Sequence, residues 1–582
     1  MNFNACSLIE FFLTLYKLGV QDFVVSPGSR STPLALCAHE LQLQTQAYSK
    51  DKRARCFVGI DERSCGFFAL GRARATGKPA CLICTSGTAP AHYLPAILEA
   101  KHSRVPMIVL SADRPPQAQN MGAPQTADQV KIFGSAIEQF FQTPACNAAN
   151  CSADAETNYA SQLALDVYAA ASLPVGAPVQ VNVPLEDTLA LDERFLQDRM
   201  HKKLQAKAAF YPTITEVRAQ LGADELQDLC ALIQEHKTVL VVGPLSGEKQ
   251  ELEELLKFAA KYELPLLPDP LSQLRSWNHH CCISSYDSLI KQQVIGAFDL
   301  IIRFGSFPVS KALFTSQVES ELVVDESCTR DFVCKTTRFV RMSPFEFARV
   351  LNTCSYTATE EQKEYLRNLR ALDDEFWFKE AQERPKELSL AQIIEEQRLS
   401  EASCVREVIA SIPEGSLLFC GNSMPIRHLD ACYKAANKRI YCMAHRGLNG
   451  IDGTLAAVLG ASLDFDRSTC IVGDLTFFHD VSSLAFAQEL KRAEFECHNH
   501  SCVVVVLNNK GGAIFGNLFQ KEYARHFERL FMCEQQTQIK LLAFAYGLSY
   551  VCVSADQRSF KREYEALLQK PGVHVLEVLL AE

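Results

Sequence analysis

The chain of 582 residues has no run of about 18 uninterrupted apolar residues, the length that a membrane-spanning helix requires. It has no basic excess either: 58 Lys and Arg against 68 Asp and Glu leave a net charge of −10, with the basic residues scattered. The first absence excludes a membrane span, and the second removes the electrostatic footprint of a nucleic-acid-binding protein. We therefore expect small-molecule substrates.

Export features are also missing. The first 25 residues mix charged with apolar side chains and lack the basic start, long apolar stretch and small-residue cleavage site of a signal peptide. The 23 cysteines lie largely in apolar, strand-like runs such as Ala80 to Cys84, which favours reduced, buried thiols over disulfides. These features predict a cytoplasmic protein.

One cysteine and histidine cluster precedes a strand near the C-terminal end: Cys497, His498, His500 and Cys502. A zinc finger would need a second ligand pair at a similar spacing, and none accompanies it. We expect a polar loop here.

Short apolar runs alternate with amphipathic stretches along the whole chain. The strand candidates are Phe23 to Val25, Ala80 to Cys84, Met107 to Leu110, Thr238 to Val242, Leu300 to Ile302, Leu322 to Val324, Thr469 to Val472, Val503 to Leu507 and His574 to Leu579. This alternation predicts an α/β fold with parallel sheets covered on both faces by helices. Charged segments at 192–205 and 357–401 divide the chain into three doubly wound domains, 1–190, 205–355 and 395–582.

Polar residues follow two of the C-terminal strand candidates. The strand ending at Val472 leads into Gly473 and Asp474, and the strand ending at Leu507 leads into Asn508 to Gly512. Ligands bind at the carboxyl ends of strands in such sheets, so Asp474 and Asn509 can meet. Their oxygen ligands suit Mg²⁺ rather than zinc. Each motif alone could be a turn or a loop. Together they resemble the cofactor signature of thiamine diphosphate enzymes.

Such an enzyme needs a carboxylate against the aminopyrimidine ring, where a shared proton favours the imino tautomer. Glu62 opens an apolar helical stretch that ends near Leu70. The simpler interpretation is that Glu62 is an acidic residue in a first helical turn, favoured by the helix dipole. Because the C-terminal motif is present as well, we favour the catalytic interpretation of Glu62.

Blocks throughout the chain resemble the 2-succinyl-5-enolpyruvyl-6-hydroxy-3-cyclohexene-1-carboxylate (SEPHCHC) synthase family of thiamine diphosphate enzymes, in family order. They are Ser26 to Pro33, Asp61 to Ser64, Thr85 to Ala89, Ala112 to Pro116, Gln125 to Gln129, Gly421 to Arg427, Arg446 to Gly453 and Gly473 to Asp480. Leu475 stands where the wider superfamily has a second glycine, and it matches this narrower family. His445 and His92 stand where the family usually has Asn.

The resemblance implies a transferase of menaquinone biosynthesis that uses thiamine diphosphate with Mg²⁺, or Mn²⁺ in its place. It would decarboxylate 2-oxoglutarate and add the succinyl carbanion to isochorismate, acting as a homodimer or a dimer of dimers. The alternatives are another thiamine diphosphate decarboxylase, an acetolactate synthase-like enzyme or a catalytically silent homologue.

The resemblance also implies roles for individual residues. Glu62 would be the catalytic acid, and Asp474, Asn509 and the Gly511 carbonyl would hold the metal. The residues expected at the cofactor are Ser423, Ile451, Asp474, Leu475, Thr476, Asn509, Ile514 and Phe515. Those expected at the anionic substrates are Ser29, Arg30, Arg114, Gln125, Lys311, Arg427 and Arg446, where arginine forks grip carboxylates.

Overall fold

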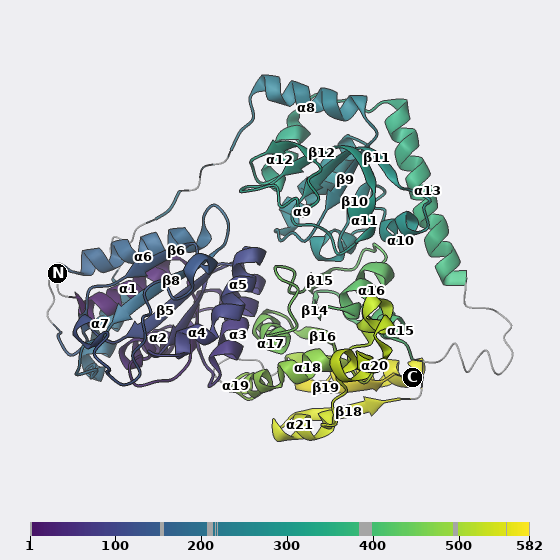
Figure 1. Ribbon diagram of the computed structural model, residues 1–582. Coiled ribbons are helices and arrows are strands. Elements are labelled where there is room, and N and C mark those ends of the chain that lie inside the picture. The colour runs from purple at the N-terminus through teal and green to yellow at the C-terminus, as the bar shows by residue number, and fades with distance from the viewer. Residues whose placement is uncertain are drawn as a thin grey trace.

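The computed structural model describes residues 3–151, 156–206, 213–215, 217, 219–382, 399–492, 499–554 and 556–580. The chain forms three α/β units (Figure 1): the N-terminal unit at the left, the central unit at the top and the C-terminal unit at the lower right. All strand pairings described within the three large sheets are parallel. The predicted fold class is confirmed.

The N-terminal sheet has six strands. In spatial order they are β3 (Arg55–Val58), β2 (Asp22–Val25), β4 (Ala80–Cys84), β5 (Met107–Asp113), β8 (Pro178–Pro184) and β6 (Gln139–Gln142). One face is covered by α1 (Ala5–Leu18), α2 (Thr32–Thr45), α6 (Glu156–Ser172) and α7 (Glu193–Gln205). The other face is covered by α3 (Glu62–Thr76) and α5 (Leu94–Ser103). Beside the sheet, β1 (Phe3–Asn4) pairs with β7 (Cys146–Asn147).

Alternation along the strands assigns side chains to the two faces. Phe23 and Val25 point into the α1 and α2 side, whereas Val24 points into the α3 side. Cys81 and Cys84 likewise lie in different cores, as the two-residue period of a strand requires. Their CxxC spacing therefore does not bring the two thiols together.

The central sheet runs β10 (Leu266–Pro268), β9 (Thr238–Val242), β11 (Ala297–Phe304), β12 (Gln317–Val324) and β13 (Thr336–Val340). Its core on one side includes α8 (Ala223–Glu235), α9 (Lys249–Lys261) and α12 (Pro344–Thr353). On the other side lie α10 (Tyr286–Lys291) and α13 (Glu360–Gln382), the long helix that runs along the edge of this unit in Figure 1.

The C-terminal sheet runs β15 (Ile440–Met443), β14 (Ser416–Cys420), β16 (Arg467–Gly473), β17 (Ser501–Asn508), β19 (Gly572–Leu579) and β18 (Ser549–Val553). One face packs on α15 (Glu401–Ser411), α16 (Met424–Cys432) and α22 (Gln557–Leu568). The other packs on α17 (Thr454–Ala461), α19 (Phe486–Glu489) and α21 (Ile539–Ala545).

The N-terminal and C-terminal units share one core, because α3 packs directly on α17. A Cβ atom on Gly71 would lie 2.0 Å from the Ala457 carbonyl oxygen, so only glycine permits this approach. Next to it the fully buried Arg72 pairs with Asp22 at 3.1 Å and with Asp464 at 2.7 Å. These contacts hold the two units against each other.

Each sheet draws its strands from one of the three predicted domain ranges. The predicted boundaries stay predictions; α7, which follows the first of them, packs on the N-terminal core through Leu196 and Met200. No described helix has both the length and the apolar character needed to cross a membrane.

Candidate active site

Four adjacent strands of the C-terminal sheet end at one edge, and each carries a predicted site residue at or just beyond its carboxyl end. Arg446 follows β15, Ser423 follows β14, Asp474 follows β16 and Asn509 follows β17. The order β15-β14-β16-β17 places these four residues in a row. Neighbouring strands lie about 5 Å apart, so the row is on the scale of a small-molecule ligand.

Asp474 is 3% exposed and is the first residue of α18 (Asp474–His479). One carboxylate oxygen accepts a hydrogen bond from the Leu475 backbone N–H at 2.8 Å. Burial nevertheless raises the pKa of Asp474 to about 6. A bound cation would favour the ionised form and bring this pKa down.

Asn509 has the orientation that a metal ligand needs. Its Nδ2 donates to Glu401 Oε1 at 2.6 Å, while its buried Oδ1 has no hydrogen-bond partner among the described residues. Gly511 has φ +129°, and a Cβ there would lie 2.0 Å from the Met532 carbonyl oxygen. A carboxylate, an unpaired amide oxygen and a glycine loop fit a hard cation such as Mg²⁺.

Asn422 and Ser423, which lie between β14 and α16, accept hydrogen bonds from Arg446 of the row and from Arg427 of α16. Arg446 donates from Nη1 to Asn422 Oδ1 at 2.9 Å, and Arg427 donates to the Ser423 carbonyl oxygen at 3.3 Å. Ser423 itself has φ 73° and ψ −130°, a conformation that a non-glycine residue adopts only under strain. Such strain concentrates where a loop must present groups to a ligand.

Asn422 braces the loop that carries Arg446. Its Nδ2 donates to the carbonyl oxygens of His445 at 2.8 Å and Gly450 at 2.7 Å, so all of its polar atoms are used. Ile451 follows this loop and is half-buried. Ile451, one of the residues expected at the cofactor, is therefore attached to a braced backbone.

The remaining predicted cofactor residues flank the metal motif. Thr476 is buried and Leu475 half-buried on α18, while Ile514 and Phe515 are half-buried after β17. The Phe515 ring lies 5.5 Å from that of Phe531, between centroids. These side chains leave apolar surface beside the row.

The central unit also reaches this edge. Asp269 accepts from the Val309 backbone N–H at 2.6 Å, and Val309 lies in the core of the C-terminal unit's sheet. Two residues further on, Lys311 is exposed and precedes α11 (Ala312–Thr315). The contact around Val309 therefore holds the start of the segment that carries the predicted lysine against the C-terminal unit.

A second row lies at the carboxyl edge of the N-terminal sheet. Glu62 opens α3 after β3, Ser29 and Arg30 follow β2, and Arg114 follows β5. Gln125 donates from Nε2 to the Ser86 carbonyl oxygen at 3.2 Å, just beyond β4. The strands concerned are adjacent, in the order β3-β2-β4-β5.

Among the described residues, the groups expected to bind substrate do not join the two rows. In the described chain, Arg30 donates to the Leu185 carbonyl oxygen and to Asp187, both within its own unit. The start of α3 does touch the C-terminal unit, where Arg63 donates to the His479 carbonyl oxygen at 3.1 Å. Each chain thus presents two half-sites on two units.

Comparison with known proteins assigns both halves to one cofactor. Residues 10–132 match the model of the thiamine pyrophosphate enzyme N-terminal TPP binding domain, and residues 427–578 match that of the C-terminal TPP binding domain. The chain is 33% identical over 97% of its length to the 2-succinyl-5-enolpyruvyl-6-hydroxy-3-cyclohexene-1-carboxylate synthase of Bacillus cytotoxicus, covering 92% of that relative. It belongs to the SEPHCHC synthase family.

The chain is similar to other members of the family over nearly its full length. The synthases of Desulfitobacterium hafniense and Lactococcus lactis subsp. lactis are each 35% identical, over 97% and 98% of this chain and 95% and 96% of their own. The crystal structure of benzoylformate decarboxylase from Polynucleobacter necessarius has the same fold: TM-score 0.69 at 14% identity, covering 100% of this chain and 99% of that one.

Three residues that the SEPHCHC synthase resemblance left without a role contribute to the site geometry. Asn422 stands inside the quoted block Gly421 to Arg427, so its position next to Ser423 was a usable signal. Glu99 accepts from the backbone N–H groups of Gly447 and Leu448, and Glu401 accepts from Asn509. Nothing in their local sequence marks the last two.

His445, which stands where the family usually has Asn, has a buried side chain. His445 is 2% exposed between the rings of Phe67 and Phe419, each with its centroid 5.3 Å away. Burial lowers its pKa to about 4. The side chain is therefore neutral at pH 7 and adds no cation beside Arg446. His92, the other departure, is exposed at the end of α4 (Ala89–His92).

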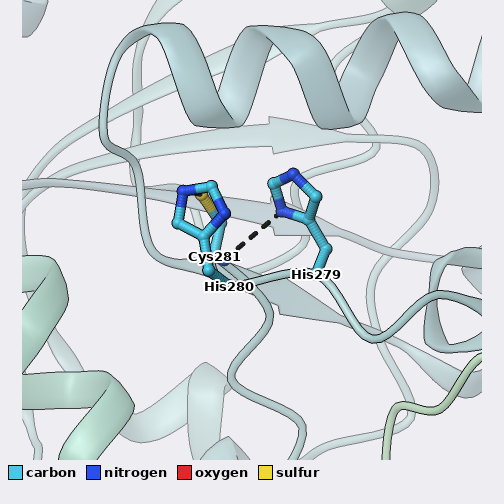
Figure 2. A group of neighbouring side chains, drawn as sticks. All are labelled: His279, His280 and Cys281. Carbon is cyan, nitrogen blue, oxygen red and sulfur yellow. Dashed lines mark hydrogen bonds between the residues drawn. The ribbon is translucent and has the colours of Figure 1, made fainter.

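The predicted loop around Cys497 and His498 lies outside the described residues, although Cys502 is buried in β17. The central unit brings three other metal-ligating side chains together: His279, His280 and Cys281 (Figure 2). His279 Nδ1 already accepts from the Cys281 backbone N–H at 3.3 Å, and burial raises the pKa of the Cys281 thiol far above its usual range. These interactions oppose a thiolate metal site.

Proposed function

We propose that this chain decarboxylates 2-oxoglutarate and adds the resulting succinyl carbanion to isochorismate, giving SEPHCHC in menaquinone biosynthesis. The observation that carries the proposal is the row at the C-terminal sheet edge, which combines Asp474 and Asn509 with Arg446, next to Arg427 on α16. Identity to SEPHCHC synthases over nearly the full length supports the choice of substrates.

Thiamine diphosphate, when bound, supplies the carbon that adds to the 2-oxo acid and stabilises the carbanion left after CO₂ departs. Asp474, the Asn509 amide oxygen and the Gly511 carbonyl would hold Mg²⁺, or Mn²⁺, on its diphosphate. Glu62 would share a proton with the aminopyrimidine ring. Ile514 and Phe515 would exclude water from the reacting carbon.

The electrostatics of the row favour an anionic substrate. Burial lowers the pKa of Arg446, and the nearby charge of Arg427 lowers it further. Two guanidinium groups that repel each other are stabilised electrostatically when a carboxylate lies between them. Both proposed substrates carry carboxylates, whereas an enzyme with a neutral acceptor would have little need for this pair of cations.

We also propose that the active site is completed by a second chain, as a homodimer or dimer of dimers. The cofactor must contact both rows of residues. Large exposed apolar side chains lie beside each row. Ile60, two residues before Glu62, is 90% exposed, and Met121, four residues before Gln125, is 77% exposed; Leu448, two residues after Arg446, is 47% exposed. Exposed apolar residues of this kind mark interaction surfaces.

The compartment proposed is the cytoplasm. Every cysteine identified in the described part of the chain is a free thiol, and most are buried. A reducing compartment keeps thiols in this form.

The decisive experiment incubates purified protein with thiamine diphosphate, Mg²⁺, 2-oxoglutarate and isochorismate, and follows isochorismate consumption. Isochorismate consumption that requires thiamine diphosphate, Mg²⁺ and 2-oxoglutarate supports the proposal. CO₂ release without isochorismate loss would indicate a simple decarboxylase, and preference for pyruvate would indicate an acetolactate synthase-like enzyme. The matched control is Asp474→Ala, which removes the metal ligand.

A further inference from the structure

Glu401 joins the start of α15 to the metal motif through a hydrogen bond with Asn509. It is the first residue of α15, and its side chain is 16% exposed. Oε1 accepts the hydrogen bond from Asn509 Nδ2 at 2.6 Å, and Oε2 lies 3.3 Å from His428 Nε2. The carboxylate is close enough to Asp474 to act on it electrostatically.

This contact decides which way the Asn509 amide faces. A carboxylate oxygen accepts the hydrogen bond, so the NH₂ end of the amide points toward Glu401. The planar amide then directs Oδ1 away from Glu401. Oδ1 is the buried oxygen that has no partner among the described residues.

We propose that Glu401 is a positioning residue for the metal site: it holds the Asn509 amide so that Oδ1 can ligate the cation. His428, on α16, lies 3.3 Å from the second carboxylate oxygen, which accepts no hydrogen bond among the described residues. The inference rests on the metal site of the proposed function and goes beyond it, since Glu401 would act through Asn509 and not as a ligand. Outer partners of metal ligands typically change metal affinity by about 10-fold to 100-fold.

Two substitutions separate positioning from charge. Glu401→Gln keeps the side-chain length and an acceptor oxygen for Asn509 but loses the charge. Glu401→Asp keeps the charge and a good residue for the helix start but is one methylene too short. Positioning predicts that E401D binds metal at least about 10-fold more weakly than E401Q. A direct ligand or a general charge effect predicts the reverse order.

The measurement is Mn²⁺ affinity in the presence of saturating thiamine diphosphate, from the electron paramagnetic resonance signal of free Mn²⁺. Glu407 provides the matched control, because it lies on the same helix and pairs with Lys561 at 3.0 Å. E407Q and E407D are expected to bind Mn²⁺ like the wild type. Thermal unfolding of the metal-free proteins shows that the variants are folded, and E401A replaces E401D if the latter is not.

The outcomes distinguish this inference from the function on which it rests. Wild-type protein without saturable Mn²⁺ binding would contradict the proposed cofactor site, and with it the role of Glu401. Wild-type binding with equal affinities for E401D and E401Q, or a tighter E401D, would overturn the positioning role and leave the proposed function standing.

Discussion

His445 should make the protein sensitive to acid, because its imidazole is buried between two units. It lies against Phe67 of α3 on one side and Phe419 of β14 on the other, and its Nδ1 is 3.8 Å from Glu99. Burial lowers its pKa from 6.5 to about 4 in the folded protein. The unfolded chain therefore binds a proton at a higher pH than the folded chain does.

The sign and size of the effect follow from this difference. A base with a lowered folded pKa contributes stability that is present above the unfolded value of 6.5 and lost as the pH falls toward about 4. The difference of about 2.5 between these two pKa values corresponds to roughly 3 kcal/mol of stability. Below pH 4 the loss from this residue is complete.

The test is His445→Asn, assayed by urea unfolding at pH 7, 5.5 and 4. Loss of packing shifts the stability of H445N equally at every pH, so the diagnostic is the pH dependence. The wild type should lose about 3 kcal/mol more than H445N between pH 7 and pH 4. The exposed His102 gives the control, H102N, which removes a solvated imidazole. Parallel curves for wild type and H445N would refute the reasoning.

Three further predictions concern the two half-sites. Asp474→Ala should abolish the rise in melting temperature that the wild type shows only with thiamine diphosphate and Mg²⁺ together; an unchanged rise would contradict the metal assignment. Glu62→Gln should bind the cofactor but lose exchange of its C2 proton by orders of magnitude, as followed by NMR in deuterium oxide. Wild-type exchange would remove Glu62 from its role. Mixing the two inactive variants after reversible dissociation should restore part of the activity, and mixed dimers without activity would mean that each chain builds its own site.

The elements of the fold follow from local pattern. Each predicted strand forms, and each pairs in parallel, because runs of apolar residues between helical stretches can be buried only in a sheet covered on both faces. Asp474 and Asn509 stand just beyond the carboxyl ends of adjacent parallel strands, as the same pattern predicted. Glu62 at the first position of α3 was likewise readable from its place before an apolar helical stretch.

The sequence by itself therefore determined the fold class, the strands and the residues that stand at their carboxyl ends. Only the tertiary structure decided how these residues are oriented and what surrounds them. Glu401 and Asn509 are 108 residues apart, and His445 owes its low pKa to burial against Phe67 and Phe419. Local periodicity encodes which face of an element is apolar. It carries no information on which distant side chain will face a given amide or imidazole, because that depends on how whole units pack.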